Sequence, residues 1–245
     1  MIELPPRDGV RFIKNVLIPM GDGVRLALDL HVPCEEEQED WRERPRPLLL
    51  EYIPYRKDDS APYTGYHHYF AQHGIIGARL DCRGTGSSEG VNTDEYTPRE
   101  QEDAVEAIQW LAQQSWCTGK IGTFGSSQGG YAQNYLAVTR PPHLSCQYMV
   151  DTGLSLYHEG YRLGGTTRPE RFKGMDRNCR VAAHNRALMA EWFEHPEYDE
   201  YWEAVDCTRH FGRMNVPCFT IGSWYDFMNQ GSVASFQGRQ HRGGP

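Results

Sequence analysis

The sequence predicts an α/β fold, with one mostly parallel sheet and helices on both of its faces. Two apolar runs bounded by glycine or proline, at residues 47–54 and 74–81, are typical of strands that are buried on both faces. Helical patterns follow at 97–114 and 129–139, with another strand pattern between them at 119–124. Strands of this kind, alternating with helices, favour a parallel sheet.

The sheet is expected to begin with an antiparallel pair. Residues 11–32 contain two runs rich in β-branched and aliphatic residues, separated by Gly21-Asp22-Gly23. Glycine and aspartate in a short connection between two such runs predict a β-hairpin. The runs at 47–54 and 74–81 would then continue the sheet with parallel pairing.

The helix over 97–114 has clear signals at its N-terminus. Thr97 is the expected cap, Pro98 occupies the first helical position, and Glu100 completes a capping box. Four residues at helical spacing would cover the sheet with an apolar stripe: Ala104, Ile108, Leu111 and Ala112.

The later part of the chain changes character twice. Residues 151–210 are rich in aromatic and charged residues with helical rather than strand periodicity, which predicts an inserted helical cap. Strand character returns at 215–226, and a further helix is expected over 227–240. The predicted organisation is therefore a core made of residues 1–150 and 211–245, with the cap at 151–210.

Ser127 lies between the strand at 119–124 and the helix at 129–139, in the stretch GTFGSSQGG. A G-x-S-x-G pentapeptide alone is better explained by a flexible turn, because glycine and serine are common loop residues. Its position between strand and helix favours a nucleophile elbow, in which Gly125 and Gly129 give the clearance that a sharp turn requires. The Gln128 amide, at the helix N-terminus, could then stabilise an oxyanion.

The composition excludes several classes of partner. The 245 residues are 39% hydrophobic and 24% charged, which suits a soluble globular protein with one sizeable core. A net charge of −8 and a pI near 5.7 give no positive surface for nucleic acid. No segment reaches the roughly 18 apolar residues of a membrane span, and the N-terminus lacks the apolar run of a signal peptide. Seven cysteines without C-x-x-C spacing fit reduced thiols and a cytoplasmic location.

Five motifs cover most of the chain, at 20–33, 54–57, 81–90, 109–130 and 216–226. In this order they resemble the cocaine esterase and X-prolyl dipeptidyl aminopeptidase family of α/β-hydrolases. The resemblance implies an α/β-hydrolase fold. It also assigns the glycine-rich stretch 81–90 to a structural turn, in which Asp81 and Arg83 hold loops, rather than to a phosphate-binding loop.

The resemblance implies three catalytic roles. Ser127 would be the nucleophile, Asp226 the acid that orients the base, and Tyr55 a side-chain donor to the oxyanion. The order of serine before acid is the one that α/β-hydrolases use, and both Tyr55 and Asp226 follow predicted strands. The alternatives are a packed tyrosine at the rim of the site for Tyr55 and a helix N-cap for Asp226.

The chain departs from the family in the catalytic histidine. In relatives this residue follows the acid in a G-P-W-x-H segment after one more strand, whereas beyond Asp226 this sequence has only His241. His241 is the candidate base, and a solvated tail histidine is the alternative. The family's β-rich C-terminal domain is also missing, so we expect a truncated chain whose exposed sheet edge invites self-association or a partner chain.

Two function classes follow from these residues. The first is a serine hydrolase that cleaves a small ester, amide or peptide through an acyl-enzyme without a cofactor; it could be a carboxylesterase or an X-prolyl dipeptidyl aminopeptidase. The second is a catalytically incompetent fragment or binding subunit that lacks the histidine. Trp192 and Phe193 could line an acyl pocket, although aromatic residues at helical spacing are more often core.

A metal site is not expected. His67, His68 and His73 are close in sequence, but no carboxylate or cysteine spacing accompanies them. Surface or packed histidines explain this group.

Overall fold

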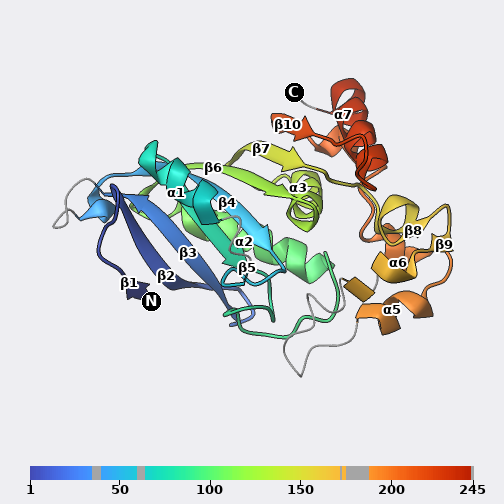
Figure 1. Cartoon of the computed structure of the whole chain (residues 1–245), viewed down its shortest axis with the longest axis horizontal. Coiled ribbons are helices and arrows are strands. Elements are labelled where there is room, and N and C mark those ends of the chain that lie inside the picture. The colour runs from blue at the N-terminus through green and yellow to red at the C-terminus, as the bar shows by residue number, and fades with distance from the viewer. Residues whose placement is uncertain (35–39, 60–63, 172, 175–187, 244–245) are drawn as a thin grey trace.

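A mixed sheet of eight strands forms the centre of the protein (Figure 1). The computed structural model describes residues 1–34, 40–59, 64–171, 173–174 and 188–243. In these residues the strand order is β1-β2-β3-β5-β4-β6-β7-β10. The strands are β1 (Ile2–Glu3), β2 (Val10–Pro19), β3 (Arg25–Pro33), β4 (Arg46–Ile53), β5 (Ile76–Asp81), β6 (Cys117–Ser126), β7 (Leu144–Val150) and β10 (Cys218–Ile221).

The pairing directions confirm the predicted sheet. β1, β2, β3 and β5 pair antiparallel in that order, and β2 with β3 is the predicted hairpin. From β5 through β4, β6 and β7 to β10 every pair is parallel. The fold is therefore α/β with a mostly parallel sheet, and the carboxyl ends of the parallel strands meet at one edge, where sites in such folds are built.

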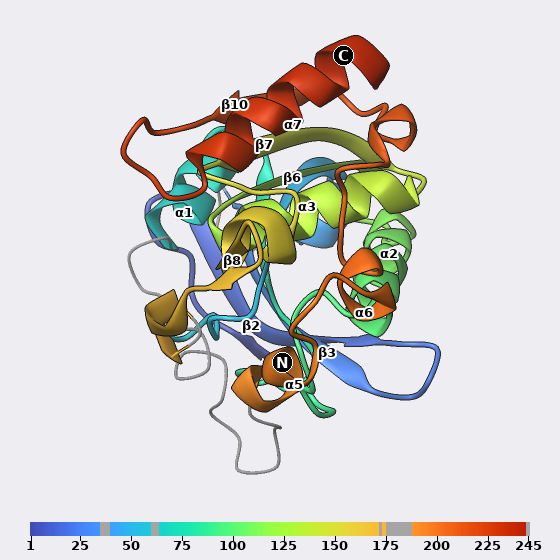
Figure 2. The same cartoon turned by 90° about the vertical axis from the view of Figure 1, so that its right-hand side faces the viewer.

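Helices cover both faces of the sheet (Figure 2). The longer ones are α1 (Thr64–Gln72), α2 (Pro98–Ala112), α3 (Gln128–Thr139) and α7 (Asn229–Arg242). α1 packs against β3 and β5, while α2 and α3 pack against β6 from the other side. α7 joins the α3 side, where the Arg239 guanidinium donates to Asn134 Oδ1 over 3.0 Å and to Gln147 Oε1 over 3.0 Å.

The predicted signals at the start of α2 are present with one change. The Thr97 hydroxyl accepts from the Glu100 N–H over 3.2 Å, as a cap does. The Glu100 carboxylate, however, accepts from the Tyr96 N–H, one residue before the cap. Tyr96 has a positive φ of 58°, which turns its N–H toward the helix start.

The segment 151–210 is less helical than its periodicity predicts. After a π-helical turn (Leu156–Gly160) it contains a small hairpin of β8 (Arg162–Leu163) and β9 (Thr166–Thr167), and then the short helices α5 (Leu188–Glu194) and α6 (Glu200–Glu203). Residues 172 and 175–187 of the segment lie outside the described part. Its aromatic residues pack into a second core against α3 and α7, to the right of the sheet in Figure 1. That core includes Tyr131, Tyr135, Tyr157, Tyr161, Trp192, Trp202 and Phe211.

Among the longer described elements, α1 and β7 were not predicted. In β7 the buried residues Gln147 and Met149 alternate with exposed Tyr148. Because buried Gln147 is polar and exposed Tyr148 is aromatic, the sequence lacks the alternation of apolar and polar residues that predicts a strand. β7 is important for the site because it lies between β6 and β10 in the sheet.

The described residues cover the α1 face of the sheet only in part. Beyond α1 a hollow of about 500 Å³ lies over β4, β6 and β7; its lining includes Leu49, Tyr66, Phe70, Phe124, Gly125 and Tyr148. Next to it, Tyr148 and Phe219 stack with ring centres 5.6 Å apart, and 62% of Phe219 is exposed. Among the described residues β10 pairs only with β7, so its outer edge has no strand partner there.

Candidate active site

Ser127 occupies a strained turn between β6 and α3. Its φ of 56° and ψ of −119° are unusual for a residue with a side chain, and such conformations concentrate at functional sites. A Cβ atom on Gly125 would lie 3.1 Å from the Gly129 backbone, so a side chain at 125 would crowd the turn. At Gly129 the nearest atom would be 3.8 Å away, which leaves room. The clearance that the turn needs is therefore supplied by Gly125 rather than by both glycines.

The turn is fixed to the sheet and to the helix. The Ser127 N–H donates to the Val150 carbonyl at the end of β7 over 3.0 Å. The Ser127 carbonyl accepts from the Gly130 and Tyr131 N–H groups over 2.9 and 3.1 Å, which starts α3. The backbone of Ser127 is thus fixed while the residue stays partly exposed.

Two hydrogen-bond donors converge beside the Ser127 hydroxyl. The Tyr55 hydroxyl lies 3.4 Å from Ser127 Oγ, and the Gln128 N–H nitrogen lies 3.3 Å from the same tyrosine oxygen. Tyr55 and Ser127 are 72 positions apart in the chain. A tyrosine O–H and a backbone N–H at a helix start are the kind of donors that stabilise negative charge on an acyl oxygen.

The loop that carries Tyr55 is anchored from its other side. The Lys57 N–H donates to Asp81 Oδ1 over 2.6 Å, and Lys57 Nζ lies 2.7 Å from Asn15 Oδ1 and 3.1 Å from Asp29 Oδ1. Burial raises the pKa of Asp81 to about 6, against the N–H groups of Ser87 and Lys57, which favour the charged form. The turn after β5 thus holds the Tyr55 loop, as the sequence predicted for Asp81.

Arg83 has the second predicted role in this turn. Its guanidinium makes two hydrogen bonds to Asp103 on α2, of 2.8 and 2.7 Å, and an ion pair of 2.9 Å with Asp22 in the β2–β3 hairpin. A planar guanidinium bonded at both ends fixes the turn between α2 and the hairpin.

Asp226 lies at the same edge of the sheet as Ser127. Ser126, Val150 and Ile221 are aligned across β6, β7 and β10, and Asp226 follows Ile221 by five residues. Since neighbouring strands are about 4.8 Å apart, the ends of β6 and β10 are separated by about 10 Å. The segments that carry Ser127 and Asp226 therefore leave the sheet at the same edge, with only β7 between their strands.

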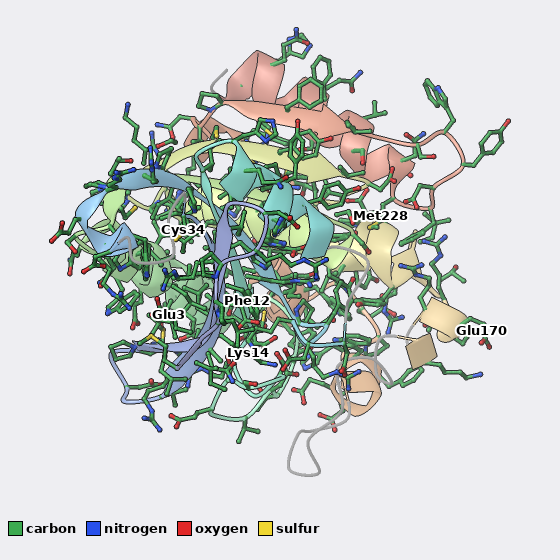
Figure 3. The ribbon with its side chains drawn as sticks, turned by 60° about the vertical axis from the view of Figure 1, so that its left-hand side comes forward. Glu3, Phe12, Lys14, Cys34, Glu170 and Met228 are labelled. Atoms are coloured by element: carbon green, nitrogen blue, oxygen red, sulfur yellow. The ribbon has the colours of Figure 1, made fainter. Side chains whose placement is uncertain are left out.

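The Asp226 carboxylate also holds the start of α7. Asp226 Oδ1 accepts from the Met228 N–H over 2.7 Å, and the Asp226 N–H donates to the Ser223 carbonyl over 3.0 Å. Met228 lies on the opposite side of the molecule from Glu3 of β1 (Figure 3). The helix N-cap alternative for Asp226 is not realised, because the N-cap of α7 is Met228 and Asp226 bonds within the turn that precedes the helix.

The structure does not bring His241 to Ser127. His241 is exposed in the last turn of α7 and borders a hollow of about 390 Å³ with Leu154 and Phe211. It lies twelve residues after Asn229, about 18 Å along the helix axis at 1.5 Å per residue. Within the described ranges no histidine ring is within hydrogen-bond distance of Ser127 Oγ, whose bonded neighbour is Tyr55.

Trp192 and Phe193 have different environments. Trp192 is fully buried, its ring stacks on Tyr161 with centres 4.1 Å apart, and its indole N–H donates to Asp94 Oδ1 over 2.9 Å. Half of Phe193 is exposed. Trp192 thus packs the second core and has no surface to offer a substrate in this structure.

The histidines near residue 67 are packing groups. His67 is fully buried, and its ring lies 5.7 Å from that of His31 and 5.0 Å from that of Phe124. Burial lowers the pKa of His31 to about 4, so it is neutral near pH 7. In the part of the chain that the structure describes, no three histidine, cysteine or acidic side chains are arranged to hold a metal ion.

A mostly parallel sheet with a serine in a strand-to-helix elbow defines the α/β-hydrolase class. The sequence pattern of the X-Pro dipeptidyl-peptidase (S15 family) matches residues 22–182 and 174–243, and the chain belongs to this family. None of the described helices is long and apolar enough to cross a membrane.

Individual relatives agree with this family. The chain is 27% identical to cocaine esterase from Rhodococcus sp. (strain MB1 Bresler), over 91% of its own length and 45% of that protein. It is also 27% identical to a putative serine esterase of Mycobacterium bovis, over 56% of the chain and 24% of the relative. The chain thus spans less than half the length of these relatives.

Solved structures share the fold. A CocE/NonD family hydrolase from Staphylococcus aureus superposes with a TM-score of 0.81 at 23% identity, covering 96% of this chain and 45% of that one. An acetyl xylan esterase from Paenibacillus sp. R4 has a TM-score of 0.65 at 15% identity, covering 100% of this chain and 79% of that one.

Proposed function

We propose that this chain carries the nucleophile, the oxyanion donors and the acid of a serine hydrolase that cleaves ester or amide acyl bonds. The observation that carries the proposal is the placement of the Tyr55 hydroxyl and the Gln128 N–H beside a strained, partly exposed Ser127. Membership of the S15 family and the similarity to cocaine esterase support it. Small esters, amides or peptides are the substrates that fit this chemistry.

The proposed reaction has two halves. Ser127 Oγ attacks the acyl carbon while a base takes its proton, and the resulting oxyanion accepts hydrogen bonds from Tyr55 and the Gln128 N–H. Collapse of the tetrahedral intermediate breaks the bond to the alcohol or amine, which receives that proton and leaves an acyl-Ser127 ester. Water then attacks the ester by the same route and releases the acid. Asp226 would orient the base and stabilise its protonated form.

The base is the group for which the chain offers the weakest candidate. His241 lies in the last turn of α7 and makes no hydrogen bond to Ser127 Oγ in this structure. We therefore propose that the base is a histidine that enters the space between the ends of β6 and β10, as the family resemblance implies for a residue that follows the acid. The full reaction would depend on that histidine.

The second candidate function is a binding module without turnover. It is favoured by one observation, namely that no described histidine is bonded to Ser127. Such a protein would retain the pocket and the oxyanion donors but would release no product. If the protein is an enzyme, an X-prolyl dipeptidyl aminopeptidase is the alternative to an esterase. That activity would need carboxylates that hold the substrate amine, and we assign none of the described residues to this task.

The test compares the chain with Ser127→Ala on a p-nitrophenyl ester and on an alanyl-prolyl anilide, each with and without added imidazole. If Ser127 and Asp226 flank the position of the missing base, free imidazole would act there as the base, so Ser127-dependent turnover should rise with imidazole concentration. The Ser127→Ala variant in the same buffer corrects for imidazole's own reaction with the ester. Equal rates for both proteins at every imidazole concentration would exclude the hydrolase and leave the binding module.

A further inference from the structure

We infer that Glu95 and Tyr161 are positioning residues for the oxyanion donor Gln128, and that they make the oxyanion site depend on the 151–210 segment. This inference rests on the proposed function, since it concerns the donor that would stabilise the oxyanion. Neither residue belongs to a motif that the sequence singles out. They are joined to Gln128 by a closed group of buried hydrogen bonds.

The Gln128 side chain is bonded to both residues at once. Its Nε2 donates to Tyr161 Oη over 2.6 Å and to Glu95 Oε2 over 3.0 Å, and Tyr161 Oη donates to the same carboxylate oxygen over 2.5 Å. The amide has two N–H protons and the phenol has one, so each proton has an acceptor. Gln128, Glu95 and Tyr161 are 5%, 3% and 2% exposed, which excludes water as a competing partner.

The orientation of the Gln128 amide follows from its neighbours. Turned the other way, the amide oxygen would face the acceptor oxygens of Glu95 without a proton between them, which costs free energy in a buried site. The carboxylate therefore accepts from the amide nitrogen and fixes the side-chain torsions. The Gln128 main chain is held as well, because the Tyr96 hydroxyl donates to the Gln128 carbonyl over 3.0 Å.

Three consecutive residues connect this group to the segment 151–210. Asp94 accepts hydrogen bonds from the Trp192 indole over 2.9 Å and from the Tyr201 hydroxyl. Glu95 binds Tyr161 and Gln128, and Tyr96 binds the Gln128 carbonyl. The Trp192 ring stacks on Tyr161 at 4.1 Å between ring centres. Residues 94–96 thus bind the elbow on one side and α5 and α6 on the other.

This arrangement has a functional consequence. The Gln128 N–H is effective only when it points at the oxyanion, and a misplaced catalytic group costs up to about a hundredfold in rate. Loss of the Tyr161 hydroxyl would free the Gln128 side chain without removing any group that touches the substrate. The effect should therefore fall on the chemical step and not on substrate binding.

The experiment compares Tyr161→Phe with Tyr157→Phe as a matched control. Tyr157, in the π-helical turn that ends just before Tyr161, is also buried, but its ring packs on Trp202, and the hydrogen bonds of the Gln128 side chain go to Glu95 and Tyr161. With a p-nitrophenyl ester, and imidazole where it is needed, we expect Tyr161→Phe to lower kcat about tenfold to a hundredfold with an unchanged KM. Tyr157→Phe should leave both constants unchanged.

A double variant separates positioning from general loosening. Glu95→Gln and Tyr161→Phe should each lower kcat, and the double variant should lose little more than either one, because all three groups act as one unit. Additive losses, equal effects of Tyr157→Phe, or a rise in KM alone would overturn the inference.

A readout without turnover keeps this inference distinct from the proposed function. Amide hydrogen exchange of Gln128, followed by NMR, should be faster in Tyr161→Phe than in the wild type and unchanged in Tyr157→Phe. If the wild type shows no Ser127-dependent turnover, the proposed function fails while this comparison still decides the positioning role. Unchanged exchange of the Gln128 amide in Tyr161→Phe would contradict it.

Discussion

A Cβ atom placed on Gly130 would lie 2.6 Å from Cβ of Thr152, although the two residues are in different elements. Thr152 is fully buried and cannot retreat, since its N–H donates to Ser232 Oγ over 3.0 Å and its carbonyl accepts from the same hydroxyl over 2.8 Å. The first turn of α3 can approach the chain after β7 only because residue 130 has no side chain.

We predict that Gly130→Ala destabilises the fold by about 1–3 kcal/mol, the usual cost of overpacking. Gly129→Ala is the matched control, because its new Cβ would have its nearest neighbour at 3.8 Å. In that helical position alanine should gain up to about 1 kcal/mol. Urea denaturation of the two variants measures the difference, and equal midpoints would mean that Thr152 does not restrict α3.

Replacing Ser127 with glycine should relieve the strain of the elbow. Glycine accepts a φ of 56° without cost, whereas alanine retains the clash of its Cβ with the backbone. We expect Ser127→Gly to be about 1 kcal/mol more stable than Ser127→Ala in urea unfolding, with both variants inactive. Ser127→Ala as stable as Ser127→Gly would show that the turn stores no strain.

Asp226 has two roles that different substitutions should separate. Asp226→Ser keeps an oxygen that can accept the Met228 N–H, so its unfolding free energy should stay near that of the wild type. Asp226→Ala removes that hydrogen bond, so its free energy of unfolding should fall by about 1 kcal/mol. Both variants should lose any Ser127-dependent turnover that uses a histidine base, since the imidazolium would have no carboxylate.

These variants should be assayed by ester hydrolysis beside a thermal melt. Wild-type turnover in Asp226→Ser would assign Asp226 to the helix start alone and would remove it from the proposed catalytic group.

Stability should fall as pH rises through the range in which Glu159 loses its proton. Burial raises the pKa of Glu159 from 4.5 to about 7, against the Leu154 and Ser155 N–H groups, which favour the charged form. Above about pH 4.5 the native state therefore keeps a proton that the unfolded chain releases. The contribution of protonated Glu159 to the free energy of unfolding is full below about pH 4.5 and is lost as the pH rises through about 7. Glu51 is shifted in the same direction for the same cause.

Glu159→Gln tests this sign. The amide oxygen can accept the same two N–H groups but does not titrate, so the variant should lose stability less steeply between about pH 4.5 and pH 7 than the wild type. The difference should be roughly 1–3 kcal/mol at about 1.4 kcal/mol per pK unit. Parallel stability curves from urea unfolding at several pH values would show that Glu159 does not carry this dependence.

The sequence predicted the sheet and the position of Ser127 because both depend on local signals. The residues next to them in the sequence were enough to identify the turn at Gly125 and Ser127 and the helix that Thr97 caps. Tyr55 and Asp226 needed the family resemblance, since their approach to the edge of the sheet depends on the path of whole strands.

The hydrogen bonds by which Glu95 and Tyr161 position Gln128 could not be predicted from the sequence. The contact between Glu95, Gln128 and Tyr161 joins three segments whose approach is set by the packing of the second core. The acidic pair Asp94-Glu95, so close to the cap Thr97, is the one local signal that was available. Burying two carboxylates needs specific partners, and besides Gln128 these come from the segment 151–210.

The hollow on the α1 face lies directly behind the nucleophile. Gly125 and Ser126, which precede Ser127, belong to its lining together with Tyr148 and Phe124. A detergent or solvent molecule with an alkyl chain that enters this space will contact the residues that set the direction of Ser127. We therefore expect alkyl detergents and cosolvents to change the rates measured with this protein, so kinetic assays should keep such additives constant.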